Sequence, residues 1–181
     1  MAHIITLSGM LGSGKSTAAK LLAAKLGYGY YSTGAAQRAL AQQRGVTTLE
    51  LNKMAETDST IDRQIDGVFQ ALAGGDANLV VDSRLAFFFL PDSFKVKLNV
   101  DPETAGARVF NDSARKGERK YASGAEATEA LLSRRALERG RWKKIYGVDI
   151  DDDGLFDCVI DTTGRTPEQV RDLILEKLEL S

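Results

Sequence analysis

Two patterns of apolar residues alternate along the 181-residue chain. Short β-branched apolar runs, such as residues 4–8 and 78–82, are typical of buried strands. Between such runs, apolar residues recur at helical spacing, as in residues 15–26. This alternation predicts an α/β fold with three layers, in which helices cover both faces of a parallel sheet. We expect five strands, at residues 4–8, 28–31, 78–82, 94–100 and 155–161.

Capping residues mark where several predicted helices begin. Asp101-Pro102 and Thr166-Pro167 each combine a capping side chain with a proline whose φ suits the first helical turn. Ligands of such folds bind beyond the carboxyl ends of the strands, where the loop after the first strand, Asp82 and Asp161 would meet. The predicted helices cover residues 15–26, 34–44, 48–56 and 59–72, a segment opening at 101–102, residues 125–144 and residues 166–180.

A glycine-rich loop follows the first predicted strand directly. Residues 9–17 match the pattern G-x-x-x-x-G-K-[ST] without a mismatch, with a strand before them and a helix after them. Glycines let the backbone curl so that N–H groups point at phosphate oxygens, and the helix N-terminus adds partial positive charge. We expect Lys15 at the β- and γ-phosphates of a nucleotide and the Ser16 hydroxyl on Mg²⁺. The phosphate-binding residues would be Met10, Leu11, Gly12, Ser13, Gly14, Lys15, Ser16 and Thr17.

Composition narrows the class of protein. The length suits one domain, and no apolar run approaches the ~20 residues that a membrane span requires. Cys158 is the only cysteine, which excludes an internal disulfide and fits a reducing cytosol, so we expect a cytoplasmic protein without a membrane partner. His3 is the only histidine, which argues against a histidine-based triad or a zinc site.

Charge is distributed unevenly, although the net charge is only -1. Residues 108–144 carry 11 basic and 5 acidic side chains, whereas residues 145–181 carry 3 basic and 10 acidic ones. A basic segment in a mildly acidic chain favours a local anionic ligand over nucleic acid, although an arginine-rich solvated helix face has the same composition.

Two strand-to-helix junctions carry candidate residues for a phosphorylated ligand. Arg38 would lie on the helix after Gly34, where its guanidinium is able to grip a phosphate with two hydrogen bonds. Asp82, at a strand end beside the glycine loop, is placed to hold a Mg²⁺-bound water, and Arg84 would reach over the same edge. The simpler alternatives are an exposed helix arginine and an aspartate that caps a turn.

Two predicted helices add further candidates. Asp62 and Asp66 fall four residues apart on one helix face, where a carboxylate can accept a hydrogen bond from the exocyclic amine of cytosine. Two solvated carboxylates are an equal alternative. Arg134, Glu138 and Arg141 share a face of another helix, so Glu138 is placed to hold the two guanidinium groups toward phosphates.

Together these motifs resemble those of nucleoside monophosphate kinases, and among them the short cytidylate kinases of archaea and some bacteria. The most specific segments are Asp-Ser-Arg-Leu-Ala at 82–86 and Tyr-Gly-Val-Asp-Ile at 146–150. The resemblance extends over nearly the whole chain, through residues 9–17, 31–38, 55–66, 134–142 and 157–162.

The resemblance implies a P-loop NTPase fold in a single domain, with acceptor-binding helices at about 33–73 and a lid at about 112–124. It implies ATP on the glycine loop, Mg²⁺ at Ser16 and Asp82, and CMP or dCMP as the acceptor. Ala35 departs from adenylate kinase-like chains, which carry Asp after Ser-Thr-Gly. The implied acceptor-binding residues are Ser32, Gly34, Arg38, Asp62, Asp66, Arg84 and Glu138.

Transfer of a phosphoryl group depends more on charge neutralisation than on covalent chemistry by the protein. No general base is required, because the attacking phosphate oxygen is already ionised. We expect Lys15, Arg115, Arg134 and Arg141 to stabilise charge on the transferred group, while Arg38 and Arg84 orient the acceptor phosphate. We expect a monomer.

Two other classes of function stay open. One is a kinase acting on AMP, UMP, dephospho-coenzyme A or shikimate. The other is a nucleotide-binding regulatory module without turnover, which would need fewer cations than this chain carries.

Overall fold

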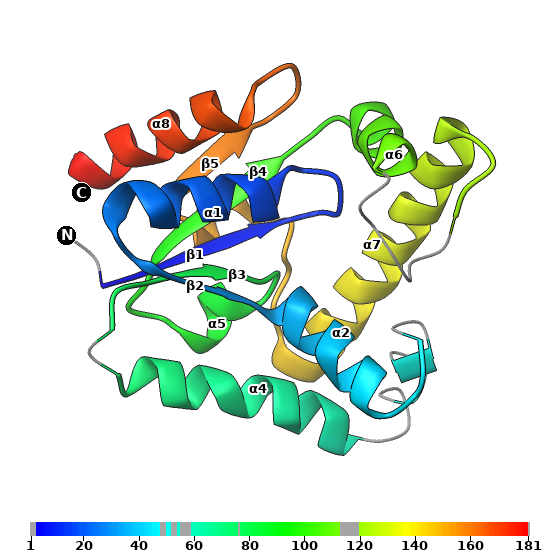
Figure 1. Cartoon of the computed structure of the whole chain (residues 1–181), viewed down its shortest axis with the longest axis horizontal. Helices are drawn as coiled ribbons and strands as arrows, with labels where there is room; N and C mark the ends of the chain where they lie inside the picture. Colours follow the sequence, from blue (N-terminus) through cyan, green and yellow to red (C-terminus); the bar gives the residue numbers. More distant parts are fainter. Residues whose placement is uncertain are drawn as a thin grey trace.

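The chain folds around one parallel sheet. The computed structural model describes residues 3–47, 50, 51, 54, 59–75, 77–112 and 120–180, with the backbone alone at 59 and 62–66. Within this part, five strands form the sheet in the order β2-β3-β1-β4-β5 (Figure 1). The strands are β1 (Ile4–Gly9), β2 (Gly29–Ser32), β3 (Leu79–Asp82), β4 (Phe94–Asn99) and β5 (Cys158–Asp161). The helices are α1 (Lys15–Leu26), α2 (Thr33–Gln43), α4 (Ser59–Ala73), α5 (Ala86–Phe89), α6 (Pro102–Asn111), α7 (Gly124–Tyr146) and α8 (Pro167–Glu179).

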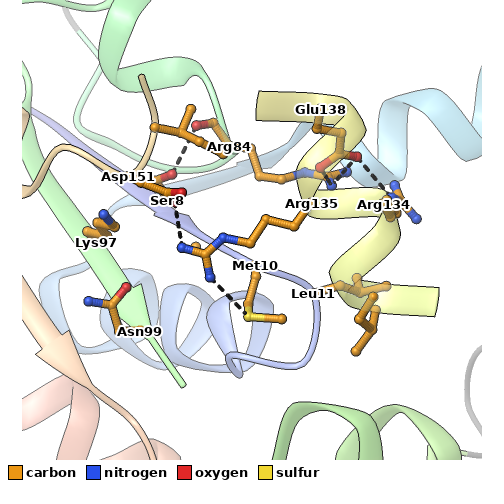
Figure 2. Close-up of a pocket in the computed structure, with 13 residues that line it drawn as sticks. Ser8, Met10, Leu11, Arg84, Lys97, Asn99, Arg134, Arg135, Glu138 and Asp151 are labelled. Atoms are coloured by element: carbon orange, nitrogen blue, oxygen red, sulfur yellow. Dashed lines mark hydrogen bonds and ion pairs between the residues drawn. The ribbon is translucent and has the colours of Figure 1, made fainter. Parts of the chain in front are cut away.

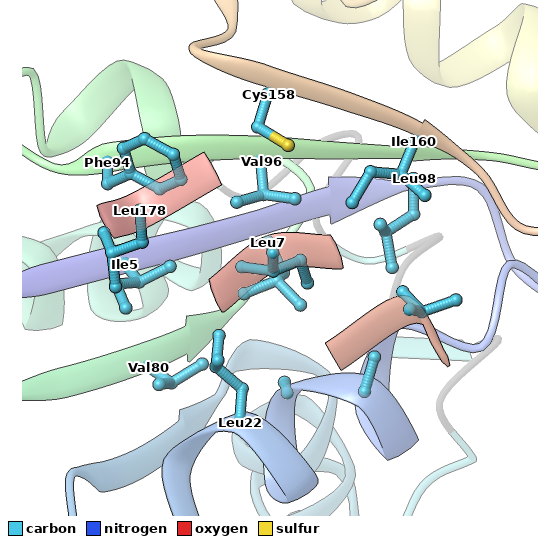
Figure 3. Close-up of a cluster of buried hydrophobic side chains, with 14 of the residues drawn as sticks. Ile5, Leu7, Leu22, Val80, Phe94, Val96, Leu98, Cys158, Ile160 and Leu178 are labelled. Atoms are coloured by element: carbon cyan, nitrogen blue, oxygen red, sulfur yellow. The ribbon is translucent and has the colours of Figure 1, made fainter. Parts of the chain in front are cut away.

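The main apolar core lies between one face of the sheet and helices α1 and α8 (Figure 3). Ile5 and Leu7 of β1 point into this core and have no exposed surface. Leu22 of α1 and Ile174 of α8 meet them there, also fully buried. Burying each such side chain contributes roughly 1.5–3 kcal/mol, so the central strand is held firmly and its carboxyl end is a rigid platform.

The opposite face of β1 is polar toward its carboxyl end. Thr6 and Ser8 are buried there, and each finds a hydrogen-bond partner, as buried hydroxyls require. The Thr6 hydroxyl lies 3.2 Å from that of Ser93, and Ser8 donates to the backbone oxygen of Arg84 at 2.9 Å. The bond to Arg84 fixes the chain just after β3, at the edge where a ligand is expected, whereas the bond to Ser93 fixes the chain just before β4.

Most predicted elements are confirmed, with shifts at their ends. The Asp101 carboxylate accepts from the Thr104 N–H at 2.9 Å, and Thr166 forms a capping box with Gln169, so both predicted caps are present. The prediction that the last strand begins at residue 155 was wrong. Residues 153–155 form a 3-10 turn, η1, after the Asp152 side chain caps the Gly154 N–H, and the strand begins only at Cys158.

One predicted helix cannot be compared with the structure, because residues 48–56 fall mostly outside the described residues.

Helix α7 is longer than the predicted 125–144. It is capped by Ser123, whose side chain accepts a hydrogen bond from the Glu126 N–H. In the described part of the chain, no helix combines the length and apolar character that crossing a membrane requires.

Helices α6 and α7 form a hairpin that packs closely at Gly106. A Cβ on Gly106 would lie 1.9 Å from Thr128 Oγ1 and 2.8 Å from the Thr128 backbone nitrogen. Met10 and Leu11 of the glycine loop pack against the same hairpin. The hairpin is therefore attached to the loop that is predicted to hold phosphates.

Gly106→Ala is expected to lower the free energy of unfolding by about 1–3 kcal/mol, because the added methyl group overpacks the α6–α7 contact. Gly140→Ala is the matched control on α7, since a Cβ there meets no atom within 4 Å. It is expected to raise stability by about 0.5–1 kcal/mol through helix propensity. Urea unfolding of both variants measures the difference, and equal stabilities would contradict the close packing.

Candidate active site

The glycine loop has the geometry that phosphate binding needs. Gly9, Gly12 and Gly14 have φ of 144°, 85° and 78°, a region that side chains disfavour. A Cβ on Gly12 would lie 2.7 Å from the Ala105 backbone oxygen, so a larger residue does not fit. Gly14 opens α1 without a side-chain capping bond, which leaves the first N–H groups of the helix for an anion.

Asp82 binds four side chains at the base of the glycine loop. The residue is only 4% exposed. Lys15 Nζ lies 3.4 Å from Oδ1, and Oδ2 accepts hydrogen bonds from Ser16 at 2.6 Å, Tyr30 at 3.1 Å and Ser32 at 3.3 Å. The predicted proximity of Asp82 to Lys15 and Ser16 is therefore present, whereas Tyr30 was missed because an apolar strand gives no sign that its hydroxyl reaches this carboxylate.

Burial and charge act in opposite directions on this cluster. Burial lowers the pKa of Lys15, and the neighbouring Asp82 carboxylate opposes that effect in part. Burial by itself would raise the pKa of Asp82, but Lys15 and the hydrogen bonds from Ser16 and Tyr30 hold it below its usual value. Asp82 is therefore ionised at neutral pH and supplies a fixed negative charge beside the loop.

The oxygen atoms of this cluster suit a hard divalent cation. Ser16 Oγ and Asp82 Oδ2 lie 2.6 Å apart at the base of the loop. Within the described residues no group of three or more His, Cys, Asp and Glu side chains is placed to cage a metal. A Mg²⁺ ion held here would therefore take its other ligands from phosphates and water, which is how Mg²⁺ is commonly bound at nucleotide sites.

A second charged cluster joins β3 to α7. Glu138 of α7 accepts hydrogen bonds from the Arg84 guanidinium and from Arg134 Nε, the latter at 2.9 Å. The Arg84 guanidinium also lies over the Trp142 ring, 5.9 Å from its centre. Figure 2 shows Arg84 and Arg134 meeting Glu138 at the same face of α7.

We predicted that Glu138 holds Arg134 and Arg141, and the prediction was wrong for Arg141. Glu138 does hold Arg134, but its second guanidinium belongs to Arg84 rather than to Arg141. The buried Nε of Arg141 has no hydrogen-bond partner in the described part of the chain. Helical spacing placed Arg141 on the right face, but only the tertiary contact between β3 and α7 brings Arg84 to the carboxylate.

The charges of this cluster stabilise one another. Burial by itself would raise the pKa of Glu138, but Arg84 and Arg134 hold it below its usual value. Burial lowers the pKa of Arg84, and Glu138 opposes that effect. The Arg84 guanidinium stays charged, because the pKa of arginine is so high that burial does not remove its proton at neutral pH. Two arginines with one carboxylate leave a net positive charge for an anionic ligand.

The other predicted residues are placed as follows. Ser32 caps α2 by accepting from the Ala35 N–H at 3.3 Å, and Gly34 and Arg38 lie on the same helix, with Arg38 exposed. Asp62 and Asp66 lie on α4, but their side chains are outside the described part of the chain. Arg115 also lies outside the described residues, as do most of residues 112–124 that were predicted as a lid.

A pocket opens between the glycine loop, β4 and α7 (Figure 2). Arg135 points into it, with Nη1 3.5 Å from Met10 Sδ, and Lys97 and Asn99 of β4 line its floor. Sequence reasoning missed Arg135 and Lys97. Adjacent arginines on a helix look alike in sequence, and a lysine in an apolar strand gives no indication of which face it occupies.

Arg108 of α6 is a further residue that sequence reasoning missed. Its guanidinium donates to the backbone oxygens of Gly12 at 3.3 Å and Thr162 at 2.8 Å. Thr162 lies just after β5, and its hydroxyl accepts from the same guanidinium at 3.3 Å. Arg108 thus ties the outer wall of the glycine loop to the end of β5.

The fold and the site together define a P-loop nucleotide-binding protein, because a parallel sheet presents the glycine loop, Lys15, Ser16 and Asp82 at one edge. More narrowly, the chain belongs to the Cytidylate kinase-like family, whose sequence profile matches residues 4–164.

Curated relatives are similar over nearly the whole chain, and solved structures share its fold. The cytidylate kinase of Haloarcula marismortui is 38% identical over 176 residues, which are 97% of this chain and 89% of that protein. A Lacinutrix mariniflava protein named S-adenosylmethionine-dependent nucleotide dehydratase is 35% identical over 98% of this chain, which spans only 36% of that protein. Shikimate kinase from Aquifex aeolicus shares the fold, with a TM-score of 0.58 at 20% identity over 97% of this chain and 96% of that one.

Glu138→Gln is expected to lower the free energy of unfolding by roughly 2–4 kcal/mol at neutral pH, because it leaves two guanidinium groups without their shared carboxylate. The pKa of Glu138 is lower in the folded chain than in the unfolded chain, where it is about 4.3. The ionised group therefore stabilises the fold fully above that value, and this contribution is lost as the pH falls through the folded pKa.

The difference between wild type and Glu138→Gln should accordingly be largest above about pH 5 and shrink below about pH 4. Urea unfolding across this range measures it. Glu129→Gln, at an exposed position of the same helix, is the control and should show no such trend. A pH-independent difference would contradict the charge cluster.

Proposed function

We propose that this protein transfers the γ-phosphoryl group of ATP to a nucleoside monophosphate, with CMP or dCMP as the acceptor. The end of β3 carries this proposal. Asp82 pairs with Lys15 and Ser16 of the glycine loop, while Arg84, two residues later, pairs with Glu138 of α7. Residues 82–84 therefore connect the glycine loop, which would hold a nucleoside triphosphate, to the cluster of Arg84 and Arg134. Transfer between two anions needs both sites at one edge.

The reaction follows from charge placement. An oxygen of the acceptor phosphate attacks the γ-phosphorus, the bond to the β–γ bridging oxygen breaks, and ADP leaves with that electron pair. No proton has to be removed, because the attacking oxygen is already ionised. Lys15 and the loop N–H groups neutralise the donor, while Arg84 and Arg134 reduce the repulsion between the two phosphates. Arg115 and Arg141 are proposed to add to this charge from the lid side.

Mg²⁺ is proposed to accompany ATP, held through Ser16 and Asp82. When bound, it supplies positive charge to the phosphate oxygens during transfer. Tyr30 and Ser32 keep the Asp82 carboxylate in place from the side of β2. Lys15 and Asp82 would then act together, one on the phosphates and the other on the cation.

The choice of acceptor is supported by family membership and by similarity to relatives such as the cytidylate kinase of Haloarcula marismortui. Arg38, Ser32 and Gly34 on or beside α2, with Asp62 and Asp66 on α4, are proposed to hold the acceptor. In this scheme the chain acts as one domain, with helices between residues 33 and 73 on the acceptor side and a lid at 112–124.

The test of the acceptor is a panel of CMP, dCMP, UMP, AMP and shikimate, each with Mg-ATP, followed by coupled detection of ADP. The value of kcat/KM is expected to be highest for CMP or dCMP. Turnover of shikimate alone would replace the proposal with a kinase of another class. ATP binding without turnover of any acceptor would indicate a regulatory module.

Lys15→Ala is expected to lower kcat by at least about a hundredfold, because it removes a fixed cation from the transferred group. The fold should persist, since Asp82 keeps hydrogen bonds from Ser16, Tyr30 and Ser32. Steady-state turnover and the thermal midpoint measure the two effects. Lys25→Ala, in the last turn of α1, is the matched control. Near-normal turnover in Lys15→Ala would count against the mechanism.

A further inference from the structure

An acidic segment follows α7 and binds cations on two different elements. We call residues 147–153 the strap. Asp149, Asp151 and Asp153 occupy alternate positions along it. In the described chain each of these carboxylates pairs with a cation, Asp149 and Asp151 with residues of α7 and Asp153 with β4. The strap therefore connects the arginine-rich helix to the sheet.

The contacts to α7 are made by one face of that helix. Arg139 donates to both oxygens of Asp149, at 2.8 Å and 2.6 Å, and its Nε lies 3.3 Å from Asp151 Oδ2. Arg135 Nη2 donates to Asp151 Oδ1 at 2.5 Å, and Lys143 Nζ lies 3.7 Å from Asp149. Hydrogen bonds from Arg139 lower the pKa of Asp149 far below its usual range. Residues four apart share a face, so these three cations form one stripe.

The far end of the strap is anchored in the sheet. Lys97 of β4 is only 5% exposed, and its Nζ donates to Asp153 Oδ1 at 2.6 Å. Lys97 is in register with Ser8 of β1, directly before the glycine loop. Just beyond the strap, Phe156 packs on Phe87, with ring centres 4.6 Å apart. The strap thus holds α7 relative to the strand that carries the phosphate loop.

This arrangement controls which way the other face of α7 points. Arg134 and Arg135 are neighbours in sequence, so their side chains leave the helix about 100° apart. Figure 2 shows Arg135 reaching toward Met10 and Asp151, while Arg134 and Glu138 meet the end of Arg84. If the stripe of residues 135, 139 and 143 lost its carboxylates, that part of α7 would be held less firmly about its axis, although α6 would still pack against its first turns at Thr128. Arg134 and Glu138 would then lose their alignment with Arg84.

We propose that Asp149 and Asp151 are positioning residues for phosphoryl transfer, acting through Arg135 and Arg139 to hold Arg134, and through Glu138 also Arg84, at the acceptor phosphate. This inference rests on the proposed function. Asp149 and Asp151 do not touch the substrate in this scheme. Their effect on stability is small, because partly exposed ion pairs contribute little, whereas a displacement of about 1 Å in a reacting group can slow a reaction a hundredfold.

The test compares Asp149→Asn/Asp151→Asn with Asp172→Asn, which removes an ion pair to Arg171 on α8, away from the site. We expect the double variant to lower kcat about tenfold to a hundredfold and to raise KM for the acceptor, with KM for ATP changed less than about twofold. The thermal midpoint should fall by no more than about 4 °C. Asp172→Asn should leave all kinetic values unchanged. Asp151→Glu, which keeps the charge, should recover most of the kcat lost in Asp151→Asn.

Trp142 supplies a second readout that does not depend on turnover. It is the only tryptophan, it lies on α7, and it is 6% exposed beneath Arg84. In the double variant, below the thermal midpoint, its fluorescence should shift to longer wavelength and be quenched more by acrylamide. If the wild type turned over no acceptor, the proposed function would fail, but the fluorescence of the double variant and of Asp172→Asn would still show whether the strap holds α7 in place.

Two results would overturn the proposal. One is a double variant whose kcat, acceptor KM and Trp142 quenching all match those of the wild type. The other is loss of turnover in Arg135→Gln while Asp149→Asn/Asp151→Asn keeps it, which would place Arg135 itself on the phosphates and remove the strap from the mechanism.

Discussion

The buried carboxylate of Asp82 binds donors from both sides of the site and so keeps the glycine loop and β2 in place. An isolated charge at 4% exposure would be costly, so it has to be matched by donors from several elements. Lys15 and Ser16 reach it from α1, and Tyr30 and Ser32 reach it from β2. Because one carboxylate collects all of these groups, the base of the glycine loop and two adjacent strands are held in a single arrangement.

Charge balance then organises the space above the sheet edge. Glu138 offsets part of the repulsion between Arg84 and Arg134, which allows the two guanidinium groups to stay close together. A second set of carboxylates, Asp149 and Asp151, occupies the neighbouring stripe of cations on α7. The excess of acidic residues after residue 145 therefore balances the basic helix before it. Arg84 and Arg134 share only one carboxylate, so their cluster keeps a net positive charge near the end of β3.

Several features were predictable because they depend on short stretches of chain. The glycine loop, the caps at Asp101 and Thr166, and the alternation of strands and helices each follow from local backbone preferences and apolar spacing. The proximity of Asp82 to Lys15 and Ser16 was also predictable, since the carboxyl ends of parallel strands meet at one edge. The start of β5 was not, because the Asp152 cap that forms η1 competes with an apolar run that looks like strand.

The order of residues along the chain was enough to predict the fold class, the phosphate loop and the cations Lys15, Arg84 and Arg134 of the site. The pairing of donors with carboxylates became visible in the folded chain: Arg84 rather than Arg141 binds Glu138, the Tyr30 hydroxyl binds Asp82, and Arg135 and Arg139 bind the strap. The difference comes from the distance along the chain over which each effect acts. Backbone preferences and helical periodicity act over a few residues, whereas a buried ion pair depends on how β3, β4 and α7 pack, and that packing is settled by the whole core.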